Sequence, residues 1–195
     1  MYSPAQVVPT VRFERYADFR RWVENQPGYW QLIRGIPLPS PAPNIRHQWI
    51  VGELYARFRR SVMEKGLGWV FLAPTDVKLR EDTVYQPDLV VVLYEYRDRI
   101  RETHIEGAPD VVVEVLSHAT AKRDLIDKRY DYEQSGVQEY WVVDPETGIV
   151  EVYGWEEKRF NVVARARSSG TVESRVITGL KMDVGELFRK MEPDD

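Results

Sequence analysis

Two acidic residues stand beside apolar segments of the kind that form buried strands. Asp88 directly precedes a run of apolar residues, and Glu114 directly follows three valines in a second run. Because successive side chains of a strand point to opposite faces, Glu114 shares its face with Val112 and Leu116 and points towards covered space. A carboxylate there costs free energy unless it is paired, hydrogen-bonded or bound to a cation. Glu114 is therefore the first candidate for a functional residue.

The segment after Glu114 supplies a lysine. Asp124 and Lys128 are neighbours at i,i+4 spacing on a predicted helix. If this helix packs back on the sheet, Lys128 can approach both Glu114 and Asp88. Two carboxylates with a nearby lysine suit metal-dependent phosphodiester hydrolysis. Oxygen ligands hold Mg²⁺, the metal polarises the phosphate and activates water, and the lysine stabilises the developing charge.

Other interpretations of these residues remain open at this point. Asp88 and Asp110 each follow a proline at the start of a strand, where an aspartate commonly forms a turn. Lys128 could be a solvated helix residue paired with Asp124. A pair of acids also serves glycosidases, although Lys128 then has no clear role. The chain has neither a Gly-rich phosphate loop nor a Gly-x-Ser-x-Gly elbow, which excludes a P-loop enzyme and weakens a serine-hydrolase interpretation.

Composition limits the kind of metal and the kind of partner. The 27 Lys and Arg against 31 Asp and Glu give a net charge of −4, which argues against a broad basic surface but not against a small basic groove. There is no cysteine and there are three histidines, so a metal would be a hard ion held by oxygen. Three groups of arginines are either a phosphate-tracking rim or solvated faces: residues 57, 59 and 60, residues 97, 99 and 101, and residues 165 and 167.

The length of 195 residues predicts one domain over 1–195. Within it, about 1–43 form an N-terminal helix, a strand and a stiff Pro-rich connection, and 44–191 form the core. No stretch reaches the ~20 apolar residues that span a bilayer, and the first ten residues do not resemble a signal peptide. We therefore expect a cytoplasmic protein without membrane contact.

Helical and strand periodicities alternate along the chain, which favours a mixed α/β sheet flanked by helices. The helix beginning at Asn44 is expected to bury an apolar stripe of Ile45, Trp49, Leu54, Phe58 and Val62. Predicted helices are 16–25, 44–65, 94–102, 120–135 with Thr120 as its cap, and 184–191. Predicted strands are 69–72, 77–80, 89–92, 111–113, 140–143 and 149–153, the last two joined as a hairpin.

An ordered series of motifs resembles the Uma-two family of restriction-endonuclease-like proteins. The resemblance runs from about residue 30 to residue 188. The motifs are Gln86-Pro87-Asp88-Leu89, the segment 107–117, then Thr120, Asp124, Lys128-Arg129 and Tyr132, and the segment 136–145. The resemblance implies the restriction-endonuclease-like fold, an α/β mixed β-sheet flanked by α-helices. It also implies one metal site similar to that of PD-(D/E)XK nucleases.

The resemblance also implies a role for each candidate residue. Asp88 is the acid of the Pro-Asp motif, and Glu114 is the acid of the next core strand. Both would bind Mg²⁺, or Mn²⁺ in its place, together with the carbonyl of Val115. The lysine of a standard motif would stand at Leu116, but this family places it on the following helix, where Lys128 matches. The implied function is a metal-dependent endonuclease that acts on DNA.

The chain departs from the family pattern near its N-terminus. Gln31, Arg34 and Ile36 occupy positions that are usually acidic, and His118 replaces a usual proline. His47 matches a position that is often histidine, and we expect it to be peripheral to the site. The acid losses favour an alternative, a catalytically weakened protein that binds nucleic acid or a protein partner. A homodimeric scaffold is a third reading, because six Trp and eleven Tyr are a heavy aromatic load.

Overall fold

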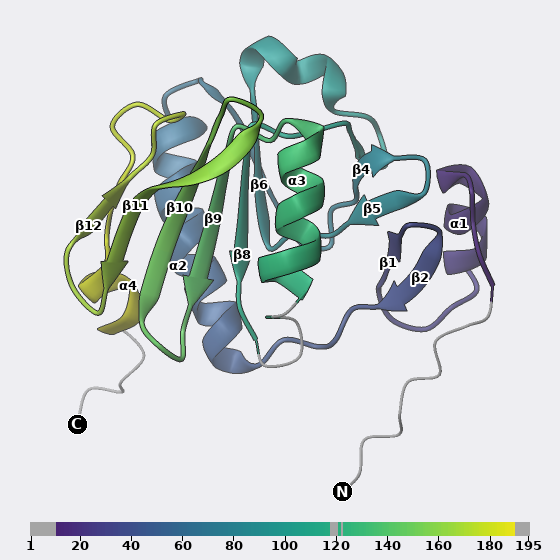
Figure 1. The fold of residues 1–195 in the computed structure, drawn as a ribbon, viewed down its shortest axis with the longest axis horizontal. Coiled ribbons are helices and arrows are strands. Elements are labelled where there is room, and N and C mark those ends of the chain that lie inside the picture. The colour runs from purple at the N-terminus through teal and green to yellow at the C-terminus, as the bar shows by residue number, and fades with distance from the viewer. Residues whose placement is uncertain (1–10, 118–120, 122, 190–195) are drawn as a thin grey trace, which may run out of the picture.

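Helices alternate with strands along the chain, as predicted. The computed structural model describes residues 11–117, 121 and 123–189 (Figure 1). The helices in this part of the chain are α1 (Tyr16–Val23), α2 (Ile45–Val62), the 3₁₀-helix η1 (Tyr94–Arg99), the π-helix η2 (Arg123–Lys128), α3 (Arg129–Ser135) and α4 (Val184–Arg189).

The larger sheet has six strands and carries the predicted acidic positions. Their order is β11-β10-β9-β8-β6-β3, and only β8 and β9 pair in parallel among them. Their bounds are β3 (Gly68–Leu72), β6 (Leu89–Leu93), β8 (Val111–Val115), β9 (Glu139–Asp144), β10 (Ile149–Glu156) and β11 (Arg159–Arg167). The hairpin predicted around 144–148 is confirmed as the antiparallel pair of β9 and β10.

A smaller sheet of five strands joins the N-terminal segment to the rest of the chain. Its order is β2-β1-β5-β4-β7, with β4 and β7 parallel. The bounds are β1 (Trp30–Ile33), β2 (Ile36–Pro39), β4 (Val77–Arg80), β5 (Thr83–Tyr85) and β7 (Ile105–Glu106), while β12 (Thr171–Glu173) and β13 (Lys181–Asp183) form a separate pair. β2 is an edge strand, a position where proline is tolerated because no ladder hydrogen bond is lost. The single domain over 1–195 stays a prediction.

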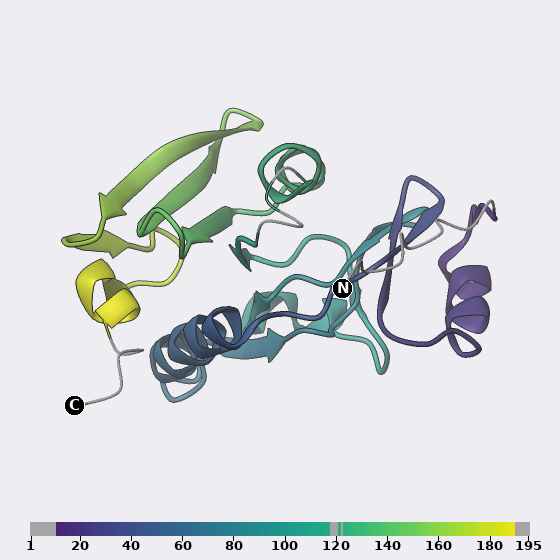
Figure 2. The same ribbon diagram turned by 90° about the horizontal axis from the view of Figure 1, so that it is seen from below.

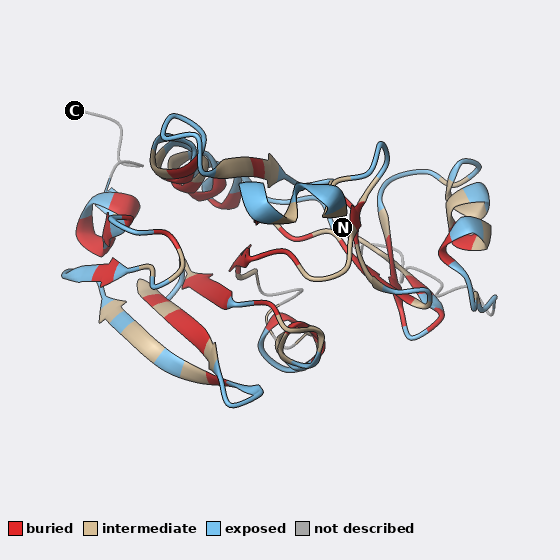
Figure 3. Ribbon diagram, turned by 90° about the horizontal axis from the view of Figure 1, so that it is seen from above, coloured by how far each residue is buried: buried red, intermediate tan, exposed pale blue. Residues whose placement is uncertain are grey.

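Strand β8 separates two hydrophobic clusters by strict alternation. Val111, Val113 and Val115 pack in the cluster that includes the inner face of α2. Val112 packs on the opposite side with Tyr132 of α3, and Figures 1 and 2 show α2 and α3 on opposite faces of the six-stranded sheet. Glu114 therefore shares its face with Val112 and points towards α3, as the alternation predicted. The five residues of β8 are all buried (Figure 3).

The helix predicted from Asn44 is confirmed as α2, but one part of its predicted apolar stripe is wrong. The Asn44 side chain caps the helix by accepting a hydrogen bond from His47 N at 2.8 Å. Leu54, Phe58 and Val62 are buried as expected. Ile45 and Trp49 are 83% and 43% exposed, because Ile50 and Val51 carry the buried face through the first turns instead.

The predicted helices 16–25 and 94–102 are found with shorter bounds as α1 and η1, and the helix predicted at 184–191 is found as α4 over its described residues. Helix α3 ends at Ser135. The next residue, Gly136, has a φ of 83°, a left-handed conformation that favours glycine. The described turns before α3 are the π-helix η2, which the side-chain spacing did not predict. Thr120, the predicted cap of the helix 120–135, lies outside the described residues, as does His118. Among the described residues, no helix is long and apolar enough to cross a membrane.

A buried carboxylate at the start of β9 ties the C-terminal segment to the large sheet. Glu139 is fully buried, and its Oε1 accepts hydrogen bonds from Trp141 Nε1 at 2.6 Å and Ser174 Oγ at 2.7 Å. Its Oε2 accepts from the backbone N–H of Arg175 at 2.7 Å. Both oxygens therefore face donors.

We predict that Glu139→Gln lowers the free energy of unfolding by about 2 kcal/mol, because the new amide N–H₂ must face a donor in a buried position. The measurement is urea unfolding followed by tryptophan fluorescence. Glu173→Gln is the matched control, since the Glu173 carboxylate is exposed and pairs with the exposed Lys181. Its effect should stay within about 0.5 kcal/mol. Equal stability of Glu139→Gln and wild type would contradict this account.

Candidate active site

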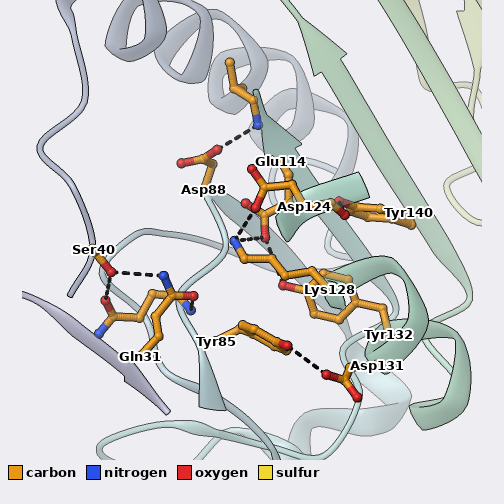
Figure 4. Close-up of polar contacts among 12 residues, drawn as sticks. Gln31, Ser40, Tyr85, Asp88, Glu114, Asp124, Lys128, Asp131, Tyr132 and Tyr140 are labelled. Atoms are coloured by element: carbon orange, nitrogen blue, oxygen red, sulfur yellow. Dashed lines mark hydrogen bonds and ion pairs between the residues drawn. The ribbon is translucent and has the colours of Figure 1, made fainter. Parts of the chain in front are cut away.

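Asp88, Glu114 and Lys128 meet in one cavity of about 370 Å³. Asp88 lies just before β6, Glu114 is on β8, and Lys128 ends η2, so three separate elements contribute (Figure 4). The antiparallel pairing of β6 with β8 brings the first two together, because Leu89 lies opposite Val113. The structure thus brings together all three side chains that the sequence selected.

Glu114 is held by two donors inside the protein. Its side chain is 3% exposed, and Oε1 accepts hydrogen bonds from Lys128 Nζ at 2.7 Å and from Tyr132 OH at 2.9 Å. Burial raises the pKa of Tyr132 well above its usual value, so its hydroxyl keeps the proton that it donates. The alternative of a solvated Lys128 is thereby wrong, because Lys128 is buried against Glu114.

A third acid, Asp124, completes the surroundings of Lys128. Asp124 is buried, and its Oδ1 lies 3.0 Å from Lys128 Nζ in an ion pair that is not also a hydrogen bond. Tyr140 OH donates to the Asp124 carbonyl at 3.0 Å and so fixes this turn of η2. The sequence offered Asp124 only as a surface partner of Lys128. In the structure Lys128 contacts Asp124 and Glu114 at once.

The buried charges shift each other's protonation. Burial raises the pKa of Glu114 to about 8, with Asp124 and Asp88 acting in the same direction and Lys128 against it. Burial by itself lowers the pKa of Lys128, but Glu114 and Asp124 outweigh that effect and keep its pKa above the usual value. Lys128 is therefore a cation at neutral pH, and it contacts two acidic side chains, Glu114 and Asp124.

His47 lies in the site, so the expectation that it is peripheral is wrong. Its Nε2 is 3.3 Å from Asp88 Oδ2, and the same carboxylate oxygen accepts a hydrogen bond from Val115 N at 2.7 Å. Burial lowers the pKa of His47, but Asp88 and a hydrogen bond with the backbone of Val115 raise it more, so its pKa lies above the usual value. His47 was expected to be peripheral because its first-turn position on α2 gives no sign of burial.

The donor set fits a hard cation with few protein ligands. Within the described residues no group of three or more Asp, Glu, His or Cys side chains is arranged to hold a metal. Mg²⁺ keeps several waters and needs only one or two carboxylates, and Asp88 and Glu114 provide those. The His47 ring contacts Asp88 and forms a hydrogen bond with the Val115 backbone, so a polar side chain already contacts two of the three predicted ligands.

The three departures from the family pattern have different surroundings. Gln31 is buried beside the cavity, where its Nε2 donates to Ser40 Oγ at 3.0 Å and its Oε1 accepts from Gln86 N at 3.2 Å. Arg34 lies 3.5 Å from the buried carboxylate of Asp131 on α3, and Ile36 is exposed. Only Gln31 lines the cavity.

Most of the selected arginines are engaged elsewhere. Arg57 pairs with Glu53 at 2.7 Å, Arg165 pairs with Glu151 at 3.2 Å, and Arg99 donates to the Ala108 carbonyl. The cavity lining contains no arginine among the residues that the structure describes. Asp110 has a structural role outside the cavity, since its Oδ2 accepts a hydrogen bond from Leu93 N, at the end of β6, at 2.7 Å.

Comparisons with known proteins identify the family and the fold of this chain. A family model described as "Putative restriction endonuclease", Uma2, matches residues 16–185. A crystal structure from Anabaena variabilis, titled as a putative nuclease belonging to DUF820, superposes on this chain with a TM-score of 0.70 at 21% sequence identity. The superposition covers 85% of this chain and 94% of the Anabaena chain. A comparison with curated proteins finds no match. The likeness confirms the predicted restriction-endonuclease-like fold, and the match over most of the chain places this protein in the Uma2 family.

Proposed function

We propose that this protein is a Mg²⁺-dependent endonuclease that hydrolyses phosphodiester bonds in DNA. The observation that carries the proposal is the buried contact of Lys128 Nζ with Glu114 Oε1 at 2.7 Å, in the same cavity as Asp88. A buried acid with a raised pKa and a buried cation together are costly as structure alone, and such pairs concentrate at functional sites. The family's description as restriction endonucleases supports the same conclusion.

Asp88 and Glu114, with the carbonyl of Val115, would hold the metal. When bound there, Mg²⁺ polarises a phosphate oxygen and lowers the pKa of a bound water. The chain holds the two carboxylates in place beforehand. Val115 N orients Asp88, and Tyr132 OH orients Glu114. Preorganised groups of this kind cost no reorganisation during the reaction.

Lys128 stabilises the negative charge that develops on the phosphate. It is a permanent cation, and its Nζ lines the cavity between Glu114 and Asp124. Asp124 contacts the lysine at 3.0 Å in addition to Glu114, and the two contacts together restrict the position of the ammonium group. The lysine therefore delivers its charge from a helix rather than from the strand position that Leu116 occupies.

A nucleic-acid-binding module without cleavage is the second candidate. Gln31 favours it, because a neutral amide bound to Ser40 and Gln86 replaces an acid of the family pattern at the cavity wall. Such a module would bind DNA but would not cleave it in the presence of Mg²⁺ or Mn²⁺. The two candidates are separated by the following experiments.

We predict that the purified protein cleaves DNA with Mg²⁺ or Mn²⁺ and that Lys128→Met lowers kcat at least about 10²-fold, since one preorganised positive group is lost. The assay follows plasmid and oligonucleotide substrates on gels, with EDTA as a blank. Lys181→Met is the matched control, because Lys181 is exposed and distant in the fold on β13. Thermal unfolding of each variant checks that it is folded. Equal cleavage by Lys128→Met and wild type would reject the role of this lysine.

We also predict that Mn²⁺ binding strengthens as pH rises from about 6 to about 8.5. Glu114 has a pKa of about 8 without metal, so the cation must displace a proton below that pH, and its binding releases protons. Isothermal titration calorimetry in two buffers of different ionisation enthalpy measures both quantities. Asp88→Asn should abolish binding, whereas Asp98→Asn on the exposed η1 should leave it unchanged. Affinity that is independent of pH would contradict the assignment of Glu114 as a ligand.

A further inference from the structure

The cavity extends beyond the acids along an uncharged wall. Tyr29, the segment 41–43 with its two prolines, and Ala73 with Pro74 line this part. The backbone ties the two sides of the wall together, because Ser40 N donates to the Tyr29 carbonyl at 2.8 Å. Figure 4 shows Ser40 and Gln31 to one side of Asp88 and Glu114, which marks the direction in which the cavity continues.

Charge is confined to one end of the cavity. The acidic, basic and histidine side chains in its described lining are Asp88, Glu114, Asp124, Lys128 and His47, and all of them surround the candidate metal site. Beside the apolar wall the cavity offers the amides of Gln31 and Gln86, which are linked to each other and to Ser40 by hydrogen bonds. The charged end can therefore bind one phosphate. The described lining of the other end has no cationic side chain that would bind a second phosphate.

The shape and depth of the cavity limit what can enter. Glu114 and Lys128 are almost completely buried, so the reacting phosphate must enter the cavity to reach them. A volume of about 370 Å³ lies at the lower end of the range for small-molecule sites, which is enough for about one nucleotide. A planar base is the part of a nucleotide that matches an apolar wall with an exposed aromatic ring.

We propose that the substrate is unpaired DNA, and that the base beside the scissile phosphate enters the cavity and stacks on Tyr29. This inference rests on the proposed function, because the metal end is taken as the phosphate site. A base in a duplex is stacked and paired, so it must be flipped out before it can reach this wall. A single strand has no such cost.

The arrangement of the arginines supports the same substrate class. Tracking a duplex requires basic side chains along two phosphate backbones. Arg57 and Arg165 instead pair with acids, and Arg97 lies over the ring of Tyr94 at 4.8 Å on η1. Single-strand binding relies more on stacking, and Tyr29 with 60% exposure offers its ring at the cavity.

The first test is binding, so that it does not depend on cleavage. Fluorescence anisotropy with Ca²⁺ compares a labelled single strand with the duplex of the same sequence. We expect at least about tenfold tighter binding of the single strand. Tyr29→Ala should weaken that binding about tenfold, and Tyr29→Trp should retain it. Tyr130→Ala is the matched control, because Tyr130 is 56% exposed on α3 and does not line the cavity.

A second arm identifies the base as the contacted group. A single strand in which abasic sites replace the bases should bind wild type and Tyr29→Ala equally. Duplex binding as tight as single-strand binding, or a Tyr29→Ala effect that persists on the abasic strand, would overturn the inference. Absence of cleavage on every substrate with Mg²⁺ or Mn²⁺ would instead reject the proposed nuclease activity and leave the binding results to decide the substrate class.

Discussion

The burial of the Glu114 carboxylate is the constraint on which the rest of the site depends. Valines on both faces of β8 leave this side chain only 3% exposed, so the carboxyl group needs polar partners from the protein. Lys128 and Tyr132 supply them from one helical segment at 2.7 and 2.9 Å. That requirement fixes how the segment 123–135 packs on the sheet, and it places a cation, three acids and a cavity in one position.

The fold meets this constraint from both faces of β8. On one face α2 covers the odd-numbered valines and delivers His47 to the end of the strand, where it contacts Asp88. On the other face α3 is held by a second buried acid, Asp131, which accepts hydrogen bonds from Arg80 at 2.8 Å and Tyr85 OH at 2.7 Å. The five-stranded sheet therefore positions the helical segment that carries Lys128. None of the charged side chains in the described cavity lining comes from that sheet.

Local pattern predicted the residues whose neighbours in sequence are also their neighbours in space. Glu114 stood out because it interrupts a strand, and Lys128 because it lies at helical spacing from Asp124. His47 was misjudged because its burial depends on β6 and β8, which are distant in sequence. Trp49 was placed in the core because periodicity alone cannot distinguish two apolar faces of α2. Strands such as β5 and β7 have two or three residues, too few to carry a periodic signal.

Negative net charge and nuclease chemistry are compatible in this arrangement. The acids that contribute to the −4 total include the proposed metal ligands Asp88 and Glu114, and a divalent cation bound there would reverse the local field towards attracting phosphate. The most direct test is a crystal soaked in Mn²⁺ and measured at a wavelength where manganese scatters anomalously. The account predicts a peak between Asp88 and Glu114, within reach of the Val115 carbonyl. Full occupancy of Mn²⁺ elsewhere, with none at these carboxylates, would contradict it.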